Sequence, residues 1–129
     1  MNSNHHERIA IVNGVRTPFC KAGTTFSSLL ADQLGVYPLK EAFLRSNVAP
    51  EEIDEVVVGC AGQPPHAANV GRVISLRAGV PKEVPAVTVH RNCASGMEAI
   101  STGAQRLLLG EADIIAAVGV ESMSNYPIM

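Results

Sequence analysis

The stretch Thr88-Val89-His90-Arg91-Asn92-Cys93-Ala94-Ser95-Gly96-Met97-Glu98-Ala99 decides how the chain folds. Its first residues belong to an apolar, partly β-branched run, residues 85–90, which is typical of a buried strand. After Cys93, apolar side chains recur on one helical stripe as far as residue 109, and Gly110 ends the pattern. The stretch therefore predicts a strand, a tight turn and a helix that begins at Cys93.

The same alternation of strand and helix extends along the rest of the chain. We predict further strands at residues 9–12, 55–60 and 113–120, helices at residues 28–46 and 69–78, and a helical turn at residues 50–53. Pro38 lies inside the first of these helices, so that helix should kink or form two pieces. Residues 121–129 should form a loop. Strands that alternate with helices predict an α/β fold, with a mixed, mainly parallel sheet flanked by helices.

Composition excludes several classes of function. The 129 residues suffice for one domain with a core, and 10 basic against 12 acidic residues leave a net charge of -2. That balance gives no reason to expect a nucleic-acid partner. No apolar stretch is long enough to span a bilayer, and the first residues lack the pattern of a secretory signal. We therefore expect a cytoplasmic protein without a transmembrane segment.

The chain has three cysteines, Cys20, Cys60 and Cys93, which are far apart in sequence. An odd, scattered set favours neither a disulfide framework nor a zinc cluster, and we expect no bound metal. Cys60 ends an apolar strand and is expected to be buried and inert. Cys20 lies in a loop, without a base near it in sequence.

Cys93 lies where its surroundings could make it reactive. Thiolate is the nucleophilic form, and the N–H groups and dipole of a helix start favour an anion. The same N–H groups could hold an oxyanion, and the small residues Ala94, Ser95 and Gly96 leave room for a substrate. A cysteine at a strand end is also commonly a small buried apolar residue. Local chemistry leaves both interpretations open.

The run around Cys93 resembles the acyl-enzyme signature of thiolases, which make and cleave 3-ketoacyl-coenzyme A. Other segments resemble the same family in the same order: Val15-Arg16-Thr17-Pro18-Phe19, residues 47–59, Gly62-Gln63, Asn69-Val70-Gly71-Arg72 and Gly119-Val120-Glu121-Ser122-Met123-Ser124. Val118 stands where a glycine is common in the family. The resemblance covers the chain from Arg8 onward. This segment resembles only the N-terminal portion of these enzymes.

The resemblance implies that Cys93 is the acyl-thioester nucleophile and that its backbone N–H contributes to an oxyanion hole. The substrates would be acyl- or 3-ketoacyl-coenzyme A thioesters, with no further cofactor, and the intact protein would be a homo-oligomer, a dimer or tetramer. The family's activating histidine and second cysteine lie in His-Pro-x-Gly and Cys-x-Gly-Gly-Gly segments, which these residues do not contain. We therefore interpret residues 1–129 as an N-terminal thiolase-like domain without the C-terminal half, with an exposed apolar helical face. The alternatives are a ketoacyl-synthase-like condensing enzyme and an inactive truncated fragment.

Five other polar residues have interpretations that do not involve catalysis. Adjacent strand residues point to opposite faces, so His90 is more readily structural than a base for Cys93. Glu121 should orient a loop rather than transfer protons, and His66 should lie at the surface or an interface. The family often uses the region of Gln63 and Arg72 in subunit contacts, although Arg72 could equally be a solvated helix residue.

Overall fold

A computed structural model describes residues 8–127. Its elements are α1 (Ala31–Leu34), α2 (Val36–Ser46), the 3-10 turn η1 (Pro50–Glu52), β1 (Glu55–Gly59), α3 (Val70–Arg77), β2 (Ala86–Val89), α4 (Ser95–Leu108), β3 (Ile115–Gly119) and the 3-10 turn η2 (Met123–Asn125). The sheet has the order β2-β1-β3, and both pairings are parallel. The predicted α/β fold with a parallel-leaning sheet is therefore confirmed.

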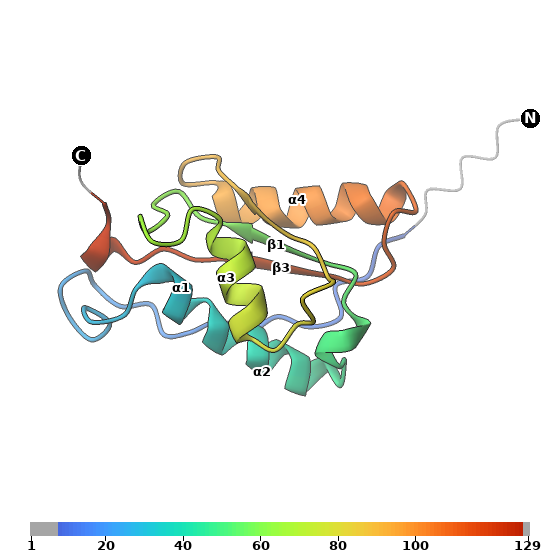
Figure 1. The fold of residues 1–129 in the computed structure, drawn as a ribbon, viewed down its shortest axis with the longest axis horizontal. Helices are drawn as coiled ribbons and strands as arrows, with labels where there is room; N and C mark the ends of the chain where they lie inside the picture. The colour runs from blue at the N-terminus through green and yellow to red at the C-terminus, as the bar shows by residue number, and fades with distance from the viewer. Residues whose placement is uncertain (1–7, 128–129) are drawn as a thin grey trace, which may run out of the picture.

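The central strand β1 is buried on both faces. Val56, Val57 and Val58 are all 0% exposed, as the unalternating β-branched run of residues 56–58 indicates. Helix α4 covers one face of the sheet, and α1, α2 and α3 lie on the other (Figure 1). Val56 and Val58 belong to the core on the side of α1, α2 and α3, together with Leu39, Phe43 and Ile74. Because successive strand residues alternate, Val57 points toward α4.

The first predicted helix forms two pieces. The division falls at Gly35, and Pro38 lies in the first turn of α2, where a helix needs no donor from it. Gly35 has a packing reason as well, because a Cβ there would lie 2.5 Å from the Ile74 Cδ1 atom. The α2 helix ends at Ser46, and its C-cap Asn47 has a left-handed backbone with φ 54°.

The strand predicted at residues 9–12 is wrong for the described structure. These residues form no regular element, and Ile11 and Val12 are 83% and 73% exposed. A strand is stable only beside a partner, and no described strand pairs with this segment. The apolar pattern was readable locally, but pairing depends on the rest of the fold.

Helix α4 presents small residues to the sheet and large ones outward. Ser95, Ala99 and Gly103 are buried, whereas Met97 and Ile100 are 67% and 46% exposed. The small stripe lets the helix lie close to the strands. The predicted exposed apolar helical face is therefore present, on the side of α4 away from the sheet. None of the described helices is both long and apolar enough to cross a membrane.

Candidate active site

Cys93 lies in a tight turn between the end of β2 and the start of α4. The turn contains Asn92 in the left-handed region, with φ 47°, a conformation that asparagine tolerates better than most residues. Cys93 is exposed, unlike Cys60. Helix α4 begins at Ser95 rather than at Cys93, so the predicted helix start was two residues too early. The difference lies in the turn, because the amides of Ala94 and Ser95 still bond to the carbonyls three residues back, of Arg91 and Asn92, before helical bonding begins.

Two side chains hold this turn in place. Ser95 Oγ accepts a hydrogen bond from Arg91 N at 2.9 Å and donates one to Asn92 O at 2.7 Å. His90 Nδ1 accepts from Asn92 N at 3.1 Å. The amides of Ala94 and Ser95 donate back to the carbonyls of Arg91 and Asn92. His90 is thus bonded within the turn itself, in agreement with the structural role predicted for it.

Glycines let the start of α4 come close to the ends of β1 and β3. A Cβ on Gly59 would overlap the Ser95 carbonyl and lie 2.7 Å from Gly96 N. A Cβ on Gly119 would lie 3.0 Å from Gly96 Cα. Since the three strands are parallel, their carboxyl ends meet at this edge of the sheet, where Cys93 is presented.

Glu121 joins the loops that follow β1 and β3. Its carboxylate accepts hydrogen bonds from Ala61 N and, at 3.1 Å, from Gly62 N. Glu121 therefore orients a loop, as predicted. Burial first, and then the charge of Glu121, raise the pKa of the Cys60 thiol to about 12. Cys60 is 0% exposed and is held as a neutral thiol, so its predicted inertness agrees with the structure.

The start of α3 is anchored to β2 by side-chain contacts that the sequence did not predict. Thr88 Oγ1 donates to Asn69 Oδ1 at 2.7 Å and accepts from Gly71 N at 2.8 Å. The Asn69 side chain also accepts from Arg72 N, which caps the helix. The Arg72 guanidinium donates to the carbonyls of Val84 and Lys82, both at 2.7 Å. Arg72 therefore supports a loop and is not simply a solvated helix residue.

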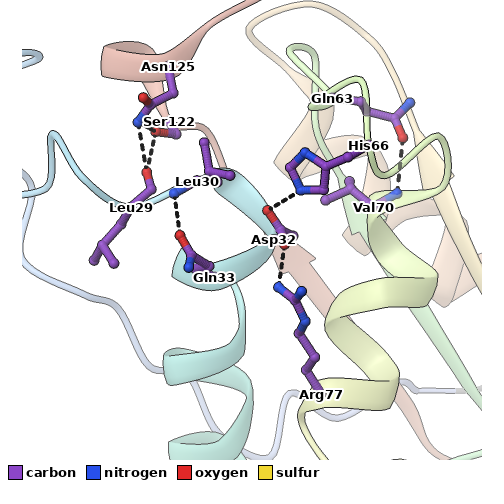
Figure 2. A network of polar contacts seen from close by, with 10 residues as sticks. All are labelled: Leu29, Leu30, Asp32, Gln33, Gln63, His66, Val70, Arg77, Ser122 and Asn125. Carbon is purple, nitrogen blue, oxygen red and sulfur yellow. Dashed lines mark hydrogen bonds and ion pairs between the residues drawn. The ribbon is translucent and has the colours of Figure 1, made fainter.

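A buried carboxylate connects α1, α3 and the loop after β1. Asp32 is 1% exposed and accepts from the Arg77 guanidinium, while its other oxygen lies 3.3 Å from His66 Nε2 (Figure 2). His66 is half exposed, consistent with the predicted surface position. Gln63 Oε1 accepts from Val70 N at 3.2 Å in the same loop. Nothing local in the sequence pairs Asp32 with residues more than 30 positions away, so no sequence signal could have found this cluster.

A second cluster in Figure 2 attaches the chain after β3 to the segment before α1. Ser122 Oγ donates to Leu29 O at 2.6 Å, and Asn125 Nδ2 donates to the same carbonyl at 3.1 Å. The predicted loop after residue 120 thus contains the turn η2 and is hydrogen-bonded to the domain. In residues 8–127, no group of histidine, cysteine and acidic side chains could hold a metal ion.

A parallel sheet with an exposed cysteine between an edge strand and the following helix defines a class of domain with a candidate nucleophile. Comparison with known proteins narrows the class. The family model for the N-terminal domain of thiolase matches residues 9–129, so the chain belongs to the thiolase family. The resemblance stated from the sequence is confirmed.

Relatives and solved structures agree with this membership. The chain is 42% identical to an acetyl-CoA acetyltransferase of Schizosaccharomyces pombe, over 92% of this chain and 30% of that protein. It is 43% identical to a beta-ketoadipyl-CoA thiolase of Acinetobacter baylyi, over 91% of this chain and 30% of that protein. The Acat5 thiolase from Ascaris suum, solved in complex with coenzyme A, superposes with a TM-score of 0.88 at 38% identity, over 92% of this chain and 31% of that one. The chain thus spans about a third of the length of these relatives.

Proposed function

We propose that the intact protein is an acyl-coenzyme A C-acyltransferase of the thiolase type, with Cys93 as its acyl-accepting nucleophile. The observation that carries the proposal is the presentation of Cys93: an exposed thiol on a turn that side chains hold in place, at the carboxyl edge of the sheet and directly before α4. Relatives named acetyl-CoA acetyltransferase and beta-ketoadipyl-CoA thiolase, and a related structure in complex with coenzyme A, support the choice of substrate class.

The proposed chemistry proceeds by covalent catalysis. Cys93 Sγ, as the thiolate, attacks the carbonyl carbon of an acyl-coenzyme A, the carbon–sulfur bond to coenzyme A breaks, and coenzyme A leaves as a thiolate that takes up a proton. In 3-ketoacyl cleavage, the carbon–carbon bond breaks instead, and its electron pair stays on the departing acetyl-coenzyme A, which is then protonated. In both cases Cys93 holds the acyl group until a second thiol or carbanion removes it.

The Cys93 N–H is proposed to contribute to the oxyanion hole. It belongs to the same rigid turn as the sulfur, so the donor and the nucleophile would keep a constant relation during attack. The amides of Ala94 and Ser95 are already used inside the turn. Thioesters of coenzyme A are proposed as substrates, with no additional cofactor.

Further parts of the proposal concern the whole protein. We propose that residues 1–129 form an N-terminal domain whose activating histidine and second cysteine are supplied by a C-terminal half, that the intact enzyme is a homo-oligomer, and that it works in the cytoplasm. Several apolar residues of α4 are exposed, which supports the proposal that another part of the intact protein covers this helix. The names of the relatives favour a thiolase over a ketoacyl-synthase-like enzyme.

Acylation by acetyl-coenzyme A tests the proposal. The intact protein, with the C-terminal half that the proposal assigns to it, is incubated with acetyl-coenzyme A, digested at low pH and analysed by mass spectrometry, alongside Cys93→Ala, Cys60→Ala and Cys20→Ala. We expect an acetyl group on the peptide that contains Cys93, present in the Cys60 and Cys20 variants and absent in Cys93→Ala. The proposal is refuted by no adduct in the wild type, or by an adduct that persists in Cys93→Ala.

A further inference from the structure

His90 makes a contact that the proposed chemistry does not use. Its Nδ1 atom accepts a hydrogen bond from Asn92 N, the amide immediately before Cys93. An acceptor nitrogen carries no proton, so neutral His90 must hold its proton on Nε2. The contact is to backbone, so it acts on the path of the chain rather than on the sulfur.

The amide that His90 binds belongs to the strained residue of the turn. Asn92 has φ 47°, and a left-handed residue other than glycine persists only where its surroundings stabilise it. Ser95 supplies part of that support through Arg91 N and Asn92 O. Ser95 Oγ binds Arg91 N and Asn92 O, whereas the acceptor of Asn92 N is the His90 ring.

Arg91, Glu121 and His66 each have other partners in the described structure. Arg91 pairs with Glu98 of α4 at 3.0 Å. The Glu121 carboxylate binds the amides of Ala61 and Gly62. His66 faces Asp32.

We propose that His90 is a positioning residue for Cys93, which acts through the backbone of Asn92 and only while its Nδ1 atom is unprotonated. Protonation converts Nδ1 from an acceptor into a donor, so two donors, Nδ1–H and the Asn92 N–H, would then face each other and the hydrogen bond would be lost. The turn loses one of its two side-chain supports, and Cys93 spends less time in its reactive geometry. The relevance of this to acyl transfer rests on the proposed function, but the effect on Cys93 itself does not.

Substitution of His90 by asparagine and by alanine separates this role from general stability. An asparagine carbonyl can accept from the amide two residues further on, as in an Asx turn, and does not titrate. Alanine offers no acceptor. The readout is the rate of Cys93 alkylation by iodoacetamide, measured peptide by peptide, because this small reagent needs no coenzyme A site. Loss of one net hydrogen bond corresponds to a fall of about fivefold.

At pH 7.5 we expect His90→Ala to alkylate about fivefold more slowly and His90→Asn to remain near the wild-type rate. On acidification, the alkylation rate of the wild type should fall more than that of His90→Asn, because only the wild type loses its Nδ1 acceptor to protonation. Nitrogen NMR should show that the neutral form of wild-type His90 holds its proton on Nε2.

Three results would overturn the proposal. These are an unchanged rate in His90→Ala, an equal loss in both variants, and an equal fall in rate on acidification in the wild type and in His90→Asn. If Cys93 takes no acetyl group but its alkylation follows this pattern, the proposed function fails and the positioning role stands. If acetylation occurs but the alkylation pattern is absent, only the positioning role fails.

Discussion

Gly59→Ala is expected to displace the start of α4 and with it the turn that presents Cys93. Gly59 does not have a positive φ, so alanine suits its backbone and the change tests space alone. The added Cβ would overlap the Ser95 carbonyl and lie 2.7 Å from Gly96 N, whereas ordinary contact begins at 3.4 Å. To restore the distance between the new Cβ and Gly96 N to 3.4 Å, the helix start would have to move away by about 0.7 Å. The Ser95 carbonyl and Gly96 N both belong to the backbone, so neither can rotate away as a flexible side chain would.

The size of the effect follows from this displacement. Overpacking of this kind costs about 1–3 kcal/mol of unfolding free energy, which for a domain of this size lowers the melting temperature by about 5–15 °C. A shift approaching 1 Å at a reactive group can cost two orders of magnitude in rate, so we expect acetylation of Cys93 to slow at least about tenfold.

Two other glycines serve as matched controls in thermal melting. Gly14→Ala meets nothing within 4 Å and should leave the melting temperature unchanged. Gly96→Ala places its Cβ 3.5 Å from Gly119 Cα, an ordinary contact, and removes a glycine from a helix, so it should be neutral or stabilising by up to about 1 kcal/mol. Wild-type melting and wild-type Cys93 acetylation in Gly59→Ala would refute the claim that this close approach positions the site.

Three further predictions concern stability. The pKa of the Cys60 thiol is about 12 in the folded protein and about 9.0 in the unfolded chain. The contribution of Cys60 to stability should therefore be fully present below about pH 9 and decrease as the pH rises above about 9. Urea midpoints at pH 8, 9 and 10 should therefore decline more steeply in the wild type than in Cys60→Ala, and equal slopes would contradict this. Arg77→Ala leaves the buried Asp32 carboxylate with His66 alone and should cost about 1–3 kcal/mol in urea unfolding. Asp32→Asn should relieve part of that loss in the double variant, and strict additivity would argue against the pair. The amides of Ile114 and then Asp113 lower the pKa of Asp54, so its stabilising effect should be present above about pH 4 and disappear as the pH falls through the lower folded value. The difference in melting temperature between wild type and Asp54→Ala should accordingly shrink on acidification, and a constant difference would exclude this role for the carboxylate.

The sequence by itself determined the features that depend on near neighbours. The strand–turn–helix around Cys93, the buried run of β1 and the division of the first helix near Pro38 all follow from hydrophobic period and from the backbone limits of proline and glycine. These preferences act over a few residues, so they can be read without knowing the fold. The ordered family resemblance then directed attention to Cys93 among the three cysteines.

Only the tertiary structure decided the features that depend on distant partners. Residues 9–12 have a strand-like pattern but no described neighbour, and a strand requires one. The pairing of Asp32 with Arg77 and His66 joins segments that meet only after α1 packs on α3. The start of α4 depends on a left-handed Asn92 and on the hydrogen bonds that Asn92 N donates to His90 and that Ser95 Oγ donates to Asn92 O, which no hydrophobic period encodes. Sequence pattern reports local preference, whereas the position of the Cys93 turn depends on contacts among β1, β3 and α4 that form only when the chain is folded.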